Sequence, residues 1–356
     1  MLQYEQELGR YLEYVAQHGA SDIHLTVGRY PTVRIDDVLL PIAETEILTP
    51  EDTDGIADVI LIDEKRRTFK EDGEVDLAYH FRDRARFRVN IFRQRGFTSI
   101  AMRLIPAKIR TLEELHLPPI VHEFGRRAQG FFLLVGPAGH GKSTTLAALI
   151  DEINHSRADH IITIEDPIEY LFTPDRAIID QREVGSDSKS FPAALRAIFR
   201  QDPDVIMVGE MRDAPTISAA LTAAETGHLV LSTLHTNNAA QTIDRIIDSF
   251  PAEQQAQVRS QLAMTLTGIV SERLVPRLAG GRIPSVEVLI ATSAVRNLIR
   301  ERKVHEIDLV IETSADDGMI SLNRSLAHLV KQREISYESA ELYSLNPAEL
   351  RMLIGR

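Results

Sequence analysis

A short glycine-rich stretch, GPAGHGKSTT at residues 136–145, directly follows the apolar run FFLLV. Its spacing, G-x-x-x-x-G-K-S, is that of a phosphate-binding loop, in which small residues let backbone amides wrap phosphate oxygens at the start of a helix. Lys142 would neutralise the β- and γ-phosphates, and Ser143 would bind Mg²⁺. The pattern therefore predicts a nucleotide site. The residues expected to bind the nucleotide are Gly136, Pro137, Ala138, Gly139, His140, Gly141, Lys142, Ser143 and Thr144.

A pair of acids ends the next apolar run, in IITIEDPIEY at residues 161–170. Glu165 and Asp166 would lie at the carboxyl edge of a parallel sheet, where α/β folds bind ligands. Paired carboxylates there can orient a water molecule or hold magnesium. The alternative is that one of them only caps the turn before Pro167.

A third motif, DPDVIMVGEMRD, places Glu210 directly after another buried strand. A Walker B strand usually ends in Asp-Glu, but Gly209 occupies the Asp position here. Glu210 would then polarise the attacking water or hold Mg²⁺ through a water molecule. The structural alternative is a simple ion pair with Arg212.

The fourth motif, GHLVLSTLHTN, carries two histidines seven residues apart, His228 and His235. An odd separation puts them on opposite faces of a regular strand, so they are poor ligands for a common metal ion. We expect each to lie near one end of the strand. The polar residues Ser232, Thr233 and Thr236 around His235 favour it as the active histidine.

The elements that must position these motifs fall into zones along the chain. Over residues 1–106, short alternating runs such as DIHLTV and ARFRVNIF predict a small α+β domain, and the proline-bearing segment 107–119 is predicted to be a linker. Over 120–270, apolar strands alternate with helical stretches, which predicts an α/β domain with a parallel sheet covered on both faces. Amphipathic stretches over 271–356 predict a helical C-terminal part.

The composition narrows the class of protein further. The 356 residues carry 40 Lys and Arg against 52 Asp and Glu, a formal net charge of −12, which disfavours a nucleic-acid partner. The absence of cysteine excludes disulfides and thiolate metal sites. No stretch approaches the ~20 apolar residues of a membrane span, and the start, MLQYEQELGR, does not have the pattern of a signal peptide. We therefore expect a cytoplasmic chain without a membrane span.

The four motifs, in this order and spacing, resemble the Walker A, Asp, Walker B and His boxes of the secretion ATPase superfamily, which powers type IV pili and type II secretion. The segments ASDIHLTVG and AVRNLIRERK are similar to segments of its retraction ATPases of twitching motility, and the resemblance covers essentially the whole chain. It implies a PAS-like N-terminal domain and a RecA-like P-loop domain followed by helices. It also implies a homo-hexamer that hydrolyses ATP with Mg²⁺ and drives pilus retraction.

The resemblance assigns roles by position in the sequence. The magnesium contacts are Ser143 and Glu210. An N-terminal segment, RARFRVNIFRQRGFTSIAMRLIP, is similar to the one that supplies arginines to the phosphates, with Arg86 as a substitute on the same strand face as Arg88. A solvated edge strand is the alternative for that segment. The catalytic set implied by the resemblance is Glu210, Glu165, Asp166, His235, His228, Arg88 and Arg103.

The same resemblance implies partners and a location. We expect an inner-membrane platform protein of the PilC type, a second retraction ATPase as a further partner, and a cytoplasmic place, peripheral at the inner-membrane base of the pilus. An accessory retraction ATPase of the PilU type remains an alternative. An assembly or secretion ATPase of the PilB type would normally carry a long extra N-terminal domain and a four-cysteine zinc motif, and a nucleic-acid translocase would need a basic pore.

Three details need a structural answer. Retraction-type loops commonly read GPTGSGKST, whereas this loop has Ala138 and His140, and we expect His140 to point outward into solvent. The stretch RIDD at 34–37 lacks the RxDG turn usual in the family. In AVRNLIRERK, read as a helix, Arg296 and Arg300 would lie on a charged outer side, opposite an apolar stripe.

Overall fold

The computed structural model describes residues 2–35, 38–81, 85–105 and 108–355. The chain separates into two compact units, the first with Met1–Lys108 and the second with Ile109–Asp166 and Phe172–Arg356; the short stretch Pro167–Leu171 is grouped with the first. Asp36 and Asp37 of the RIDD stretch lie outside the described residues, so the missing family turn has no structural answer.

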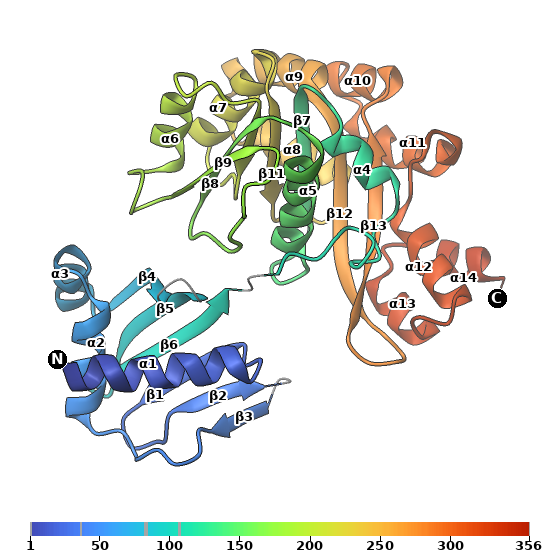
Figure 1. Cartoon of the computed structure of the whole chain (residues 1–356). Coiled ribbons are helices and arrows are strands. Elements are labelled where there is room, and N and C mark those ends of the chain that lie inside the picture. Colours follow the sequence, from blue (N-terminus) through green and yellow to red (C-terminus); the bar gives the residue numbers. More distant parts are fainter. Residues whose placement is uncertain (1, 36–37, 82–84, 106–107, 356) are drawn as a thin grey trace. The chain divides into compact units, whose positions relative to one another are not determined.

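The first unit is an α+β domain built on a six-stranded antiparallel sheet with the order β3-β2-β1-β6-β5-β4. Alternate strand residues, such as Ile23 and Val89, join α1 and α2 in one buried core, which leaves the other sheet face polar. The elements (Figure 1) are α1 Leu2–Gln17, β1 Asp22–Thr26, β2 Thr32–Ile35, β3 Val38–Pro41, α2 Pro50–Ile60, α3 Asp63–Asp72, β4 Glu74–Phe81, β5 Ala85–Gln94 and β6 Phe97–Ile105.

The second unit is an α/β domain around a seven-stranded sheet with the order β13-β12-β7-β11-β10-β8-β9. Its strands are parallel except β13, which pairs antiparallel with β12. The strands are β7 Gly130–Val135, β8 His160–Glu165, β9 Ile178–Glu183, β10 Val205–Val208, β11 Leu229–Leu234, β12 Leu266–Pro276 and β13 Arg282–Ile290.

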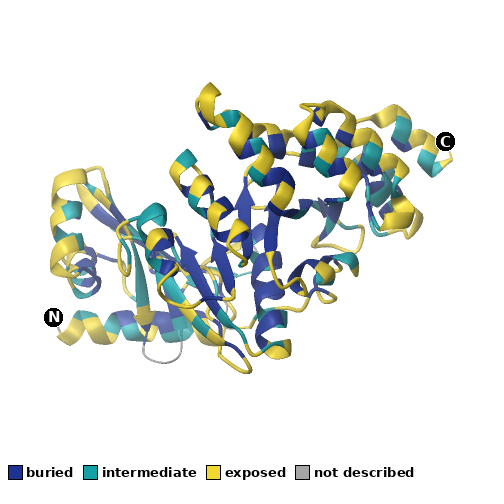
Figure 2. Ribbon diagram, turned by 90° about the horizontal axis from the view of Figure 1, so that it is seen from above, coloured by how far each residue is buried: buried dark blue, intermediate teal, exposed yellow. Residues whose placement is uncertain are grey.

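Helices cover both faces of this sheet, and Figure 2 shows its central strands as buried between them. On one face, Leu133 shares a buried cluster with α6 to α11; on the other, the ring of Phe132 stacks on Phe124 of α4. The helices are α4 Ile120–Gly125, α5 Lys142–Ser156, α6 Phe191–Ile198, α7 Ala214–Glu225, α8 Ala239–Asp248, α9 Ala252–Thr265, α10 Ser293–Arg300, α11 Ile307–Thr313, α12 Leu322–Lys331, α13 Tyr337–Tyr343 and α14 Pro347–Ile354, with short 3-10 turns at Val304–Glu306 and Ala315–Asp317.

The predicted fold class, an α+β domain followed by a parallel-sheet domain with C-terminal helices, is confirmed. The expectation of a helical chain over the whole of 271–356 is wrong at its start, because the hairpin of β12 and β13 completes the sheet. Two buried acids, Glu272 and Glu287, interrupt the apolar pattern of these strands. For this reason the sequence pattern does not predict the two strands. Part of the predicted linker, at Leu112 and Leu117, is likewise buried in the second unit.

Candidate functional site

The phosphate loop connects β7 to α5 at the carboxyl edge of the second sheet. Its three glycines have positive φ angles of 145°, 75° and 94° at Gly136, Gly139 and Gly141, which suit glycine and not L side chains. A Cβ atom on Gly136 would also lie 2.3 Å from the carbonyl oxygen of Glu272. The loop geometry therefore requires the glycines that the motif supplies.

Lys142 is buried at the first position of α5, and its ammonium group bends back over the loop. Nζ donates to the carbonyl oxygens of Gly136 and Pro137, each at 2.8 Å, and lies 3.3 Å from Nδ1 of His235. Ser143 and Thr144 are half-buried in the same turn. The loop thus holds a positive charge and a hydroxyl group beside its backbone amides, as a polyphosphate site needs.

Glu210 lies just beyond β10 and links this cluster to a second cation. Its carboxylate accepts from Arg212 at 2.8 Å and lies 3.2 Å from Nε2 of His235. Burial alone would raise the pKa of Glu210, but the hydrogen bond and charge of Arg212, together with His235, lower it below the ordinary value. Glu210 is therefore ionised at neutral pH. The ion pair with Arg212, the structural alternative for Glu210, is present, but Glu210 also contacts His235.

His235 joins the two charged groups of the site. Because Nδ1 faces the lysine ammonium, a donor, and Nε2 faces the Glu210 carboxylate, an acceptor, the contacts match a neutral imidazole with its proton on Nε2. A continuous chain of contacts thus runs from Lys142 through His235 to Glu210. This chain connects the phosphate loop to the acid that follows β10.

Glu165 is the last residue of β8, the neighbour of β10 in the sheet, and Asp166 directly follows it. The Glu165 carboxylate is buried and accepts from Thr163 at 2.7 Å and from Gln181 at 3.2 Å, whereas Asp166 is exposed. A Cβ atom on Gly209 would lie 3.3 Å from the Ile164 carbonyl oxygen, tighter than ordinary contact. Glycine at the usual Walker B Asp position therefore fits the close approach of β8 and β10.

His228 does not join this cluster. It precedes β11, at the end of the strand opposite His235, and its Nδ1 lies 2.9 Å from the carbonyl oxygen of Ala223 while its ring meets Phe199 edge-on. The six residues of β11 span roughly 20 Å at about 3.3 Å per residue. The strand therefore separates His228 from the phosphate loop of its own chain, and its place in the catalytic set stays a prediction.

Arg88 and Arg103 lie opposite each other on β5 and β6, on the polar face of the first sheet. Both are exposed, and Arg103 Nε pairs with Asp22 at 2.8 Å. Burial would raise the pKa of Asp22, but hydrogen bonds from Ser21 and Arg103 lower it. Arg88 and Arg103 therefore form one basic surface within the first unit, and the mostly buried Arg86 lies on the same sheet face.

His140 is not the outward, solvated residue that we expected. It is half-buried, its Nδ1 accepts the Leu274 backbone N–H at 3.0 Å, and its ring meets Tyr343 edge-on at 6.5 Å. Burial, with the charges of Lys142 and nearby arginines, lowers the pKa of His140. The imidazole is therefore neutral and fixes the loop to β12.

Glu272 is the residue of the site that the sequence motifs missed. It is 2% exposed, and its Oε2 accepts from the hydroxyl group of Thr145 at 2.8 Å, directly behind the phosphate loop. The available signal was an acid inside an otherwise apolar run, LTGIVSERLV. A charged residue in such a run is either exposed on one face of the strand or buried with a partner for its charge.

Within the described residues, no group of three or more His, Asp or Glu side chains is arranged to hold a metal ion by itself. Ser143 and Glu210 stay the predicted magnesium contacts.

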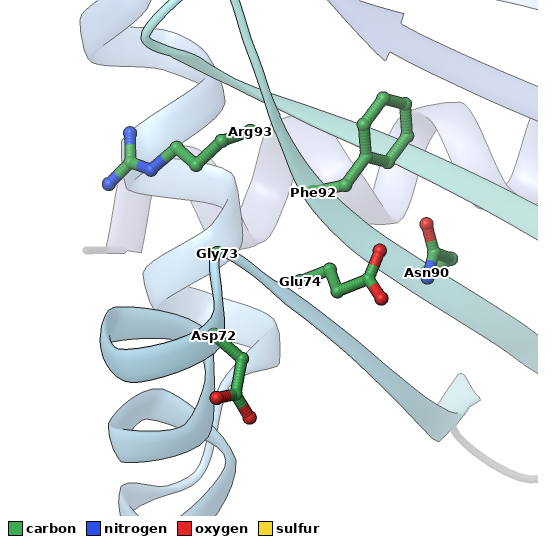
Figure 3. A pocket seen from close by; sticks show the side chains of 6 residues that line it. All are labelled: Asp72, Gly73, Glu74, Asn90, Phe92 and Arg93. Atoms are coloured by element: carbon green, nitrogen blue, oxygen red, sulfur yellow. The ribbon is translucent and has the colours of Figure 1, made fainter.

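A separate hollow of about 470 Å³ lies in the first unit, beside the start of β4. Figure 3 shows the side chains of Asp72 and Arg93 extending away from the Glu74 carboxylate. Arg93 is occupied by Thr98 at 3.0 Å and by the Phe69 ring. The hollow therefore lacks the convergent polar groups of a ligand site.

A phosphate loop after an interior strand, β7, with an acid and a histidine at the carboxyl edge, defines a P-loop nucleotide-binding domain. The chain matches the family model of type II/IV secretion system proteins over residues 3–282. It belongs to that family, and none of its described helices is long and apolar enough to cross a membrane.

Individual relatives point to one branch of the family. The chain is 44% identical over 329 residues to the type IV pilus retraction ATPase PilT of Pseudomonas aeruginosa, covering 92% of this chain and 95% of that protein. It is 40% identical to the type IV pilus ATPase PilU of the same organism, covering 98% and 91%. A crystal structure of the pilus retraction motor PilT with bound ADP matches with a TM-score of 0.90 at 45% identity, covering 97% and 98%. The resemblance inferred from the motifs is confirmed.

Proposed function

We propose that this chain is the ATP-hydrolysing motor of type IV pilus retraction and thus of twitching motility. The observation that carries the proposal is the chain of contacts from Lys142 through His235 to Glu210 at the end of the phosphate loop. It connects the group that would hold the phosphates to the group that would act on water. The identity to PilT over 92% of the chain supports retraction as the output.

The proposed reaction is phosphoryl transfer from ATP to water. Lys142, now bound to two loop carbonyls, would turn its ammonium group to the β- and γ-phosphates, and Ser143 and Glu210 would hold Mg²⁺, which neutralises developing charge. The ionised Glu210 would orient the attacking water. His235, which donates toward Glu210, would transmit the state of the phosphates to that acid. Glu165 and Asp166 would complete the polar edge.

Assembly would extend the site beyond one chain. We propose a homo-hexamer in which Arg88 and Arg103 act on the nucleotide of a neighbouring subunit, so that closing the interface completes the site and couples hydrolysis to domain movement. The motor would work in the cytoplasm, peripheral to the inner membrane at the pilus base, on a platform protein of the PilC type. A second retraction ATPase would be a further partner.

An accessory role is the second candidate, because the chain is also 40% identical to PilU over 98% of its length. The test is pilus retraction in a strain lacking its own retraction ATPases and complemented with this chain. Retraction by the chain alone supports the proposed motor, and retraction only when a second ATPase is present supports the accessory role. If the chain is expressed and the purified chain turns over ATP normally, but retraction occurs under neither condition, both candidate functions are rejected.

Lys142→Ala is the matched variant for this experiment. It deletes the charge placed on the phosphates, so it should abolish both ATP turnover and retraction. Retraction by the Lys142→Ala chain would separate motility from the phosphate loop and contradict the proposal.

A further inference from the structure

Glu272 supports the phosphate loop from behind, at both of its ends. Ser271 pairs with Val135, the last residue of β7, so the next residue on β12, Glu272, lies beside Gly136. A Cβ atom on Gly141 would lie 2.5 Å from Oε1 of Glu272, and Oε2 accepts from Thr145 in the first turn of α5. One carboxyl group therefore contacts the end of the loop and the helix whose amides face the phosphates.

The surroundings of this carboxyl group contain little charge. The α5 helix contributes Lys142, the loop contributes the neutral His140, and the residue opposite on β13 is Val286. Burial raises the pKa of Glu272 to about 7, although the Thr145 hydrogen bond and Lys142 lower it. Near neutral pH the group therefore exists in both protonation states.

We propose that Glu272 positions the phosphate loop and that its carboxyl group takes up a proton from solvent when the phosphates of a nucleotide bind. This inference rests on the proposed function as a nucleotide-binding motor. The phosphates bring negative charge to the far side of the loop and draw Lys142 toward themselves, so the ionised carboxylate loses its compensation. Protonation removes the repulsion and leaves one carboxyl oxygen as acceptor for Thr145.

Linkage makes the inference measurable, because proton uptake on binding requires that nucleotide affinity falls as pH rises. We would titrate the whole chain with ADP and Mg²⁺ by calorimetry between pH 6 and pH 8.5, in two buffers of different ionisation enthalpy. Glu272→Gln keeps the acceptor and the volume but cannot ionise. Compared with wild type, it should bind ADP up to roughly tenfold more tightly at pH 8.5 and about equally at pH 6. Its proton uptake near pH 7 should be smaller.

Glu287→Gln is the matched control. Glu287 is also buried and has its pKa raised by burial to about 7, but it accepts the Ala239 backbone N–H at the start of α8. Its replacement should leave the pH dependence of ADP affinity as in wild type. A change equal to that of Glu272→Gln would assign the effect to buried acids in general and overturn the inference.

Thr145→Val gives a second, independent readout if Glu272→Gln folds poorly. Because the Thr145 hydroxyl lowers the pKa of Glu272, its removal should move the loss of affinity to higher pH. Two results would overturn this inference but not the proposed function. One is a proton uptake by the wild-type chain equal to that of Glu272→Gln. The other is a loss of ADP affinity in Thr145→Val at the same pH as in wild type. Failure of the wild-type chain to bind ADP at any pH would overturn the proposed function with it.

Discussion

The carboxyl edge of the second sheet and the polar face of the first sheet both gather charged side chains, but in different ways. At the carboxyl edge, His235 contacts the positively charged Lys142 on one side and the negatively charged Glu210 on the other. On the polar face, Arg103 and Arg88 lie opposite each other with one carboxylate, Asp22, beside them. The first set is held together by contacts within one chain. The second is a basic surface on which Arg103 pairs with Asp22, and we propose that it also contacts the nucleotide of a neighbouring subunit.

The largest effect that separates these regions is expected for Glu210→Gln. The amide keeps the size of the side chain but cannot polarise water as a carboxylate does, so ATP turnover should fall by roughly 10²–10³-fold while MgATP still binds. Turnover and nucleotide affinity of the purified variant provide the test. Near-normal turnover would show that Glu210 does not polarise the attacking water, and Glu165 would become the candidate for that role.

The arginine face is tested by mixing two variants, each inactive alone. Arg88→Ala keeps its own loop, and Lys142→Ala keeps its arginines, so random assortment in a ring gives an intact composite site at roughly a quarter of the interfaces. We expect ATP turnover to return in proportion to the number of these intact sites. Mass measurement must first establish mixed hexamers; with these present, absence of recovery would mean that Arg88 does not act on a neighbour.

These two regions also differ in how far the sequence predicts them. The loop from Gly136 to Ser143 is contiguous, and its glycines and lysine define its geometry locally, so its motif was sufficient. Glu272 meets the loop only because β12 pairs with β7, a contact between residues far apart in the chain. The same pairing brings the Leu274 N–H to His140. No local pattern contains these contacts, and an acid or histidine in such a position looks solvated.

A smaller effect should separate the two histidines at the ends of β11. His235→Ala removes the connection between Lys142 and Glu210, so turnover should fall roughly tenfold or more. His228→Ala should change turnover by less than about threefold, since its contacts are the Ala223 carbonyl and the Phe199 ring. Parallel assays of the two purified variants, at matched folded fraction, provide the measurement. Equal losses would show that His228 acts in a neighbour's site or through the fold.

The smallest effects concern α10, where the structure corrects the expectation of two outward arginines. Arg296 donates to the backbone carbonyls of Ala263, Met264, Leu266 and Ala291, and it thereby ties α10 to the end of α9. Arg300 is exposed, and its guanidinium reaches Asn297 on the same helix at 2.8 Å. The two arginines of the retraction-type segment therefore have different physical roles.

Single alanine variants resolve those roles. Arg296→Ala leaves carbonyl groups without their charged donor and should lower the free energy of unfolding by about 1–3 kcal/mol. Arg300→Ala should change it by less than about 0.5 kcal/mol and leave ATP turnover intact. If the exposed face of α10 transmits motion, as the family resemblance implies, Arg300→Ala should still reduce twitching in cells. Normal twitching by Arg300→Ala would confine the role of this segment to holding α9 and α10 together through Arg296.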